Sequence, residues 1–85
     1  MVVRVSKKFE KQYRKLPQGI KYLAKQKETA FRKNPFDTRL ETHKLHGKEK
    51  ETWAFSVTRS YRITFIFLTR TQVLFLEIGT HDIYR

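Results

Sequence analysis

Two separated parts of the sequence carry residues that could act together on a phosphodiester. Arg62 stands in a segment that is otherwise mainly apolar, residues 61–67, and a cluster of polar side chains occupies residues 80–84. A guanidinium can bind a phosphate through two parallel hydrogen bonds, and a histidine such as His81 exchanges a proton near neutral pH. Tyr84 could stack on a base or supply a hydroxyl. These residue types are suited to binding and cleaving RNA.

Cleavage of RNA without a metal ion needs three functions. A base takes the proton of the ribose 2′-hydroxyl, whose oxygen attacks the adjacent phosphate, while an acid protonates the leaving 5′-oxygen and a cation stabilises the phosphorane. Histidine, tyrosine, lysine and arginine side chains are sufficient for these functions, and the sequence has no clustered carboxylates of the kind that metal-dependent nucleases use. An ordinary exposed strand arginine and a frayed chain end are the alternative interpretations of Arg62 and of residues 80–84.

His43 and His46 have the His-x-x-His spacing that occurs in some metal sites. A catalytic zinc site uses three protein ligands and dedicated partners behind them, and this sequence has no cysteine to complete such a set. It also shows no Gly-rich phosphate loop, nucleophile elbow or dinucleotide fingerprint. We therefore expect neither a metal ion nor another cofactor.

The charge balance indicates a polyanionic partner. The 85 residues include 19 Lys and Arg against 8 Asp and Glu, which gives a net charge of +11. Contacts with phosphates and the release of counterions relieve such self-repulsion, although an acidic protein, an anionic membrane surface or solvent alone would relieve it too. No segment is long and apolar enough to cross a membrane, and the first residues lack a secretory pattern. We expect a cytoplasmic protein that does not contact membranes.

The first 35 residues predict a strand followed by two helices. Residues 2–5 are rich in valine and favour a strand, and Ser6 stands where it can cap a helix. Residues 7–33 then carry apolar side chains at helical spacing, broken near Pro17 and ended by Asn34-Pro35. The first stripe comprises Phe9, Tyr13 and Leu16, and the second Ile20, Leu23, Ala24, Ala30 and Phe31. We expect a helical hairpin with one apolar and one basic side.

The last third of the sequence predicts three antiparallel strands. Residues 53–57, 61–68 and 73–79 alternate between apolar and other side chains, and short polar segments separate them. Residues 36–52 show no sustained period and are expected to be a connecting loop. The predicted fold class is α+β in one domain, residues 1–85: an N-terminal strand and helical hairpin pack on one face of an antiparallel sheet completed by the C-terminal three-strand meander. Arg62 would then lie on the open face.

This order of elements resembles the RelE/ParE superfamily of toxins from type II toxin–antitoxin pairs. The likeness rests on the signature L-x-G, W-x-x-x-V, Y-R-(I/V) and G-x-H, read here over nearly the whole chain. The matching segments are His43-Lys44-Leu45-His46-Gly47, Trp53-Ala54-Phe55-Ser56-Val57, Tyr61-Arg62-Ile63-Thr64-Phe65 and Ile78-Gly79-Thr80-His81-Asp82-Ile83-Tyr84. No single segment is very specific, and the likeness rests on the order and spacing of the four segments together.

The resemblance implies a metal-independent endoribonuclease that cuts mRNA in the ribosomal decoding site and is held inactive by an acidic antitoxin in a hetero-oligomer. Arg62 matches the family's transition-state arginine and His81 its C-terminal histidine, while Tyr84 resembles the terminal aromatic residue. His43 resembles a loop histidine of some members, with Glu49 or Glu51 as the alternative base because this loop is longer than the commonest form. The expected RNA-binding residues are Lys44, Lys48, Lys50 and, in the turn before Arg62, Arg59.

The same superfamily implies an alternative from another functional class. Its ParE-like branch shares the fold and inhibits DNA gyrase without catalysis. That branch generally lacks the arginine–histidine set, so the presence of Arg62 and His81 favours the nuclease. A basic RNA-binding module without toxin activity is the third interpretation.

Overall fold

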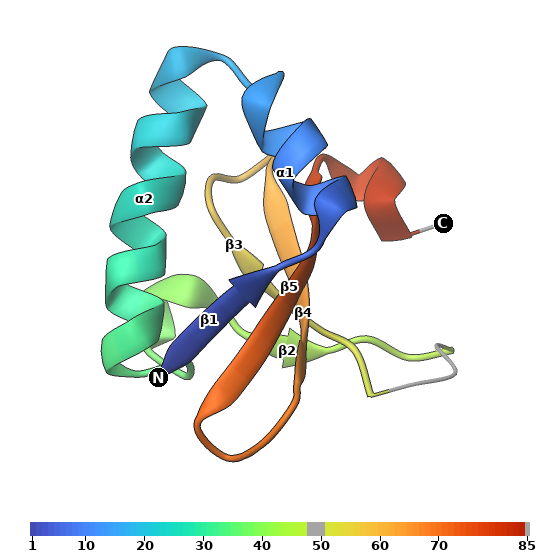
Figure 1. The fold of residues 1–85 in the computed structure, drawn as a ribbon. Helices are drawn as coiled ribbons and strands as arrows, with labels where there is room; N and C mark the ends of the chain where they lie inside the picture. The colour runs from blue at the N-terminus through green and yellow to red at the C-terminus, as the bar shows by residue number, and fades with distance from the viewer. Residues whose placement is uncertain (48–50, 85) are drawn as a thin grey trace.

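The computed structural model describes residues 1–47 and 51–84, with Tyr84 described by its backbone alone. It contains one mixed sheet, two α-helices and two short 3₁₀ turns (Figure 1). In chain order the elements are β1 (Val2–Val5), α1 (Lys7–Arg14), α2 (Gln18–Lys33), η1 (Thr38–Leu40), β2 (His43–Lys44), β3 (Trp53–Ser56), β4 (Arg62–Phe67), β5 (Gln72–Gly79) and η2 (His81–Tyr84).

The sheet has the strand order β1-β5-β4-β3-β2. Strands β2 to β5 form antiparallel pairs, and the alternating patterns predicted the three of them from β3 to β5. β1 joins the outer edge of β5 and runs parallel to it, with Val3 opposite Val73. This parallel pairing is possible because α1 and α2 carry the chain from the end of β1 to the far side of the sheet before the meander begins.

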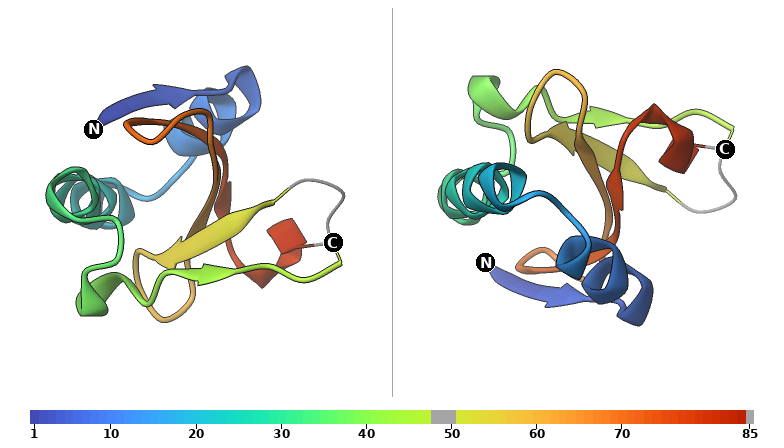
Figure 2. Two further views of the ribbon diagram at one scale, coloured as in Figure 1. Left: turned by 90° about the horizontal axis from the view of Figure 1, so that it is seen from below. Right: turned by 90° about the horizontal axis from the view of Figure 1, so that it is seen from above.

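The core lies between α2 and one face of the sheet, as Figure 2 shows from two directions. Phe31 of α2 is fully buried at its centre. Its ring stacks on Phe55 with centroids 4.8 Å apart and meets the rings of Phe65 and Phe75 edge-on at 4.9 and 5.4 Å. The four rings come from three strands and one helix, so they fix the helical layer on this face.

The prediction that residues 36–52 form only a connecting loop was wrong in part. His43 and Lys44 form β2, which pairs with β3, and Leu40 in the η1 turn is fully buried. A strand of two polar residues has no detectable period, and one isolated leucine gives no helical or strand pattern. The segment therefore adds an edge strand and a core residue that periodicity could not reveal.

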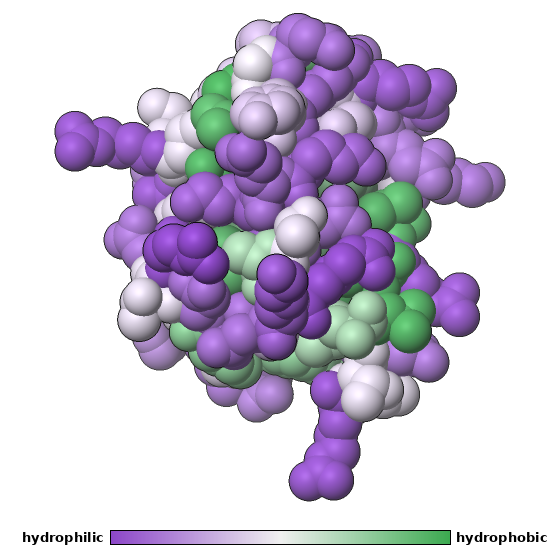
Figure 3. All heavy atoms as spheres, turned by 90° about the vertical axis from the view of Figure 1, so that its left-hand side faces the viewer, coloured by the Kyte–Doolittle hydropathy of each residue, from purple (hydrophilic) through white to green (hydrophobic). Residues whose placement is uncertain are grey.

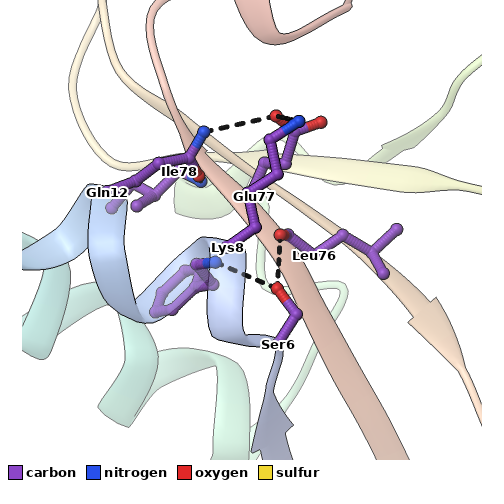
Figure 4. Close-up of polar contacts among 7 residues, drawn as sticks. Ser6, Lys8, Gln12, Leu76, Glu77 and Ile78 are labelled. Carbon is purple, nitrogen blue, oxygen red and sulfur yellow. Dashed lines mark hydrogen bonds and ion pairs between the residues drawn. The ribbon is translucent and has the colours of Figure 1, made fainter.

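Helix α1 continues the edge of β5 where β1 ends (Figure 4). The Ser6 N–H donates to the carbonyl of Phe75, and the Ser6 hydroxyl donates to the carbonyl of Leu76 at 2.7 Å. Beyond these, the side-chain oxygen of Gln12 accepts a hydrogen bond of 2.9 Å from the N–H of Ile78. The N-cap residue Ser6 and a side chain of α1 thus bind backbone groups of Phe75, Leu76 and Ile78, which blocks pairing with another strand there.

Candidate functional site

The candidate site lies on the sheet face opposite α2. In β4, Ile63 and Phe65 are buried in the core, so the alternating residues Arg62 and Thr64 belong to the other face. The pairing registers align two rows of residues across that face. One row is Ser56, Arg62 and Gly79, and the next is His43, Ala54, Thr64 and Glu77. The face predicted to carry Arg62 is therefore the one that the helices leave open.

Arg62 is half-buried and is tethered by one of its three nitrogens. Its Nη1 donates to the main-chain carbonyls of Thr58 and Tyr61 in the turn between β3 and β4. Among the described residues, Nε and Nη2 have no hydrogen-bond acceptor. These two nitrogens form one edge of the guanidinium, which is the geometry that binds two oxygens of a phosphate. The turn thus holds the side chain and leaves a bidentate edge for a ligand.

The C-terminal turn η2 brings His81 to the same end of the sheet. Gly79 is paired with Arg62, and His81 follows Gly79 by two residues, so the two Cα atoms lie within about 13 Å. Arginine and histidine side chains can meet one phosphate across such a span. His81 is exposed, and η2 lies on the side of the sheet away from α2 (Figure 2).

η2 is held against the sheet at Gly79. A Cβ atom built on Gly79 would lie 2.6 Å from Cγ2 of Ile83, so the absence of a side chain allows the turn to fold back over the strand. The N–H of Ile83 also donates to the carbonyl of Thr80 at 3.1 Å. The described part of the C-terminal segment is therefore docked rather than frayed. The side chain of Tyr84 lies outside the described residues.

His43 is exposed on the open face, in the row next to Arg62. Its Nδ1 lies 3.0 Å from the carbonyl oxygen of Glu41. A carbonyl can only accept, so this bond places the proton on Nδ1 and leaves Nε2 as the acceptor. In the neutral form of His43, this contact directs the lone pair of Nε2 away from Glu41. One strand, β3, lies between His43 and the strand of Arg62, and with an offset of two residues along the strands this gives about 12 Å between the two Cα atoms.

The expected RNA-binding residues are not grouped around Arg62. Lys44 is aligned with Trp53, which assigns it to the sheet face opposite that of His43, and its Nζ pairs with a carboxylate oxygen of Glu51 at 3.0 Å. The Glu51 side chain is thus engaged as a partner of Lys44. Arg59 is exposed in the turn before β4. Lys48, Lys50 and Glu49 lie outside the described residues.

Arg39, in the η1 turn, forms an ion pair with the carboxylate of Asp37. Arg39 binds the Asp37 carboxylate through Nε and Nη2, at 3.0 and 2.8 Å. The hydrogen bonds from the Arg39 side chain and main chain lower the pKa of Asp37 to about 2. This pair caps the η1 turn, because Asp37 also accepts from the N–H of Arg39. Arg39 therefore serves the turn that leads to β2.

Sequence reasoning missed two residues on the open face, Glu77 and Thr64. Glu77 receives the Lys8 ammonium at 3.1 Å and the Gln12 amide at 3.3 Å, so α1 reaches the rim of this face. Thr64 is buried and stands between Ala54 and Glu77. The alternation in β4 places Thr64 on the open face. Strict alternation in β5 would put Glu77 on the core face with Val73 and Phe75, and only the register shift between Thr64 and Phe65 moves it to the open face. Their types alone did not suggest a role.

Most of the net charge lies on the helical layer, away from the candidate site. Residues 7–33 hold 10 of the 19 basic residues and 2 of the 8 acidic ones, so they contribute +8 of the net +11. The face formed by α2 is correspondingly hydrophilic, with hydrophobic residues only in small patches (Figure 3). Electrostatic attraction to a polyanion would act through this layer as well as through the open face.

No helix in the described part of the chain is long and apolar enough to cross a bilayer. Within the same residues, no group of three or more histidine, aspartate or glutamate side chains is arranged to hold a metal ion.

The comparison with known proteins identifies the fold. No protein-family model matches the sequence, and no curated protein matches it significantly. Solved structures do match over nearly the whole chain. A YoeB/ParE toxin from Agrobacterium tumefaciens has a TM-score of 0.79 at 12% identity, covering 95% of this chain and 99% of its own.

Two other matches are as extensive. YafQ from E. coli has a TM-score of 0.77 at 20% identity, covering 95% of this chain and 93% of its own. A chain of the archaeal RelE–RelB complex from Pyrococcus horikoshii has a TM-score of 0.75 at 15% identity, covering 93% and 92%. The similarity extends over both helices and the whole sheet. The chain therefore has the fold of the RelE/ParE-type toxins.

Proposed function

We propose that the protein is the toxin of a toxin–antitoxin pair and acts as a metal-independent endoribonuclease on mRNA. The observation that carries this proposal is the position of Arg62. Its guanidinium is anchored through Nη1 and keeps a bidentate edge, on the open face, beside the strand that leads into His81. An anchored cation with a free phosphate-binding edge is the part that phosphodiester cleavage needs most, since charge stabilisation dominates such reactions.

The proposed reaction is attack of a ribose 2′-oxygen on the adjacent phosphorus, which breaks the bond to the 5′-oxygen of the next nucleotide. Arg62 binds the phosphate oxygens as negative charge builds up on the phosphorane. His43, with Nε2 as acceptor, takes the proton of the 2′-hydroxyl, and His81 protonates the leaving 5′-oxygen. Tyr84 stacks on a neighbouring base. The products are a 2′,3′-cyclic phosphate and a 5′-hydroxyl.

The proposed partners follow from charge and from the structural relatives. A net charge of +11, concentrated on the helices, suits a message bound in the RNA-rich decoding site of the ribosome in the cytoplasm. The archaeal relative was solved in complex with RelB, and an E. coli relative is part of a RelBE toxin–antitoxin complex. We propose that an acidic antitoxin neutralises the present chain in a similar hetero-oligomer.

The test is inducible expression in bacteria with primer-extension mapping of cellular transcripts. The proposal expects new 5′ ends within translated frames, and expects Arg62→Ala and His81→Ala each to reduce cleavage about 100-fold or more, on the scale of a lost charge-stabilising donor. Arg70→Ala is the matched control, because it removes an exposed arginine from the β4–β5 turn, which holds none of the proposed site residues. Full cleavage by both site variants would refute the assignment.

One observation favours the alternative function, inhibition of DNA gyrase. The contacts of Nη1 with Thr58 and Tyr61 give Arg62 a structural role in the β3–β4 turn that needs no RNA. If that were its main role, Arg62→Ala would lower thermal stability without removing growth inhibition. Relaxed plasmid topology on induction, with intact transcripts, would establish this alternative.

A further inference from the structure

The hydroxyl of Thr64 is a buried polar group without a hydrogen bond. The residue is only 3% exposed, and among the described residues no donor or acceptor meets its Oγ1. Buried polar groups are nearly always paired, because removing them from water without compensation destabilises the folded state. Valine has almost the same shape, favours strands as strongly, and would avoid this penalty. The position therefore carries a hydroxyl that has no partner in the described part of the chain.

Thr64 lies next to the candidate site. It is two residues after Arg62 on the same strand, so the two side chains share the open face with Cα atoms about 7 Å apart. Across the sheet it is aligned with Ala54 on one side and Glu77 on the other. Ala54 is too short to reach it, and Glu77 is turned to Lys8 and Gln12 of α1.

The C-terminal turn returns over this face at Gly79, in the row next to that of Thr64. Thr64 is buried on a face that α2 does not cover, so a ligand can reach its hydroxyl only if a segment on this face moves. Because η2 lies against the neighbouring row, its displacement is the movement that the inference requires.

We propose that Thr64 is an RNA-binding residue, whose hydroxyl donates to the RNA backbone beside the phosphate held by Arg62 once η2 is displaced. This inference rests on the proposed function and assigns a further contact to the same site. A hydroxyl bonded to an anionic phosphate oxygen gains a charge-assisted bond, which compensates for its unpaired state in the free protein. The 7 Å offset from Arg62 places this contact on the part of the backbone next to the scissile phosphate.

The test uses Thr64→Val, which removes only the hydroxyl, and Thr64→Ser, which keeps it and removes a methyl group. Each variant is compared with the wild type in melting temperature, in cleavage, and in affinity for ribosomes programmed with a 2′-O-methyl message. That message lacks the attacking hydroxyl and so reports binding alone. We expect Thr64→Val to melt at the same temperature as the wild type or higher, and to bind and cleave about 10- to 100-fold more weakly.

Thr64→Ser should show the reverse pattern, with a lower melting temperature and nearly wild-type binding. The inference is overturned if Thr64→Val binds the message as tightly as the wild type, or if it melts markedly lower, since the hydroxyl would then serve the fold. Arg62→Ala separates this failure from that of the proposed function. Loss of cleavage in Arg62→Ala with full activity in Thr64→Val refutes only the role of Thr64, whereas a wild type that neither binds nor cleaves refutes both.

Discussion

Gly79 and Ile83 are in such close contact that any side chain on Gly79 would collide with Ile83, because a Cβ atom there would lie 2.6 Å from Cγ2. Gly79 is also the cross-strand partner of Arg62. One glycine therefore determines both how closely η2 approaches the sheet and where the C-terminal residues stand relative to the arginine.

We predict that Gly79→Ala displaces η2 and reduces cleavage at least tenfold, with a loss of unfolding free energy of about 1–3 kcal/mol from overpacking. Adding Ile83→Ala removes the colliding methyl group and should restore part of the stability. Gly19→Ala in α2 is the control, since nothing lies within 4 Å of a Cβ there. Equal activity of the Gly79 and Gly19 variants would show that the position of η2 does not matter.

A second prediction concerns the contact of α1 with β5. Gln12→Met keeps the length of the side chain but leaves the N–H of buried Ile78 without its acceptor. We expect a loss of about 1–3 kcal/mol in unfolding free energy, measured by urea denaturation. Gln18→Met, at an exposed position of α2, should change stability by less than about 0.5 kcal/mol. Similar losses in both variants would mean that the Gln12 bond contributes nothing.

The aromatic core gives a third prediction. Phe31→Ala removes the ring that contacts Phe55, Phe65 and Phe75, and should cost about 3–5 kcal/mol in unfolding free energy. Phe31→Leu should cost less and remain folded if the alanine variant does not. Tyr22→Ala on the same helix is the control, because this side chain is 64% exposed. A small effect of Phe31→Ala would contradict the central position of this ring.

The pattern of the sequence was sufficient to predict the architecture, because its core residues repeat with strand and helix periods. The alternation around Ile63 assigned Arg62 to the open face, and the register confirms this. The residue roles of Arg62, His81, Tyr84 and His43 remain predictions.

Contacts that bridge distant segments were beyond sequence reasoning. The side chain of Gln12 accepts a hydrogen bond from the N–H of Ile78, which is 66 residues away in the sequence. The periodic spacing of apolar residues does not predict such a pair. The anchoring of Arg62 depends on the rotamer of a flexible side chain, and the burial of Thr64 depends on which segments fold over its side of the sheet. All three features depend on tertiary packing, which the spacing of residues along the sequence does not reveal.

The last prediction concerns the distribution of charge between the two layers. Because residues 7–33 carry +8 of the net +11, neutralising a helical lysine should weaken RNA binding more than an equal change in the β4–β5 turn. Lys25→Gln in α2 and Arg70→Gln in the β4–β5 turn both remove one charge from an exposed position. We expect Lys25→Gln to reduce the slope of log affinity against log salt by about 0.7–0.9, the contribution of one phosphate contact, and Arg70→Gln to leave the slope unchanged. Both variants should retain the wild-type rate of cleavage once saturated with message, since neither position belongs to the site. Identical slopes for the two variants would show that affinity follows the net charge alone, and that the helical layer is not a contact surface.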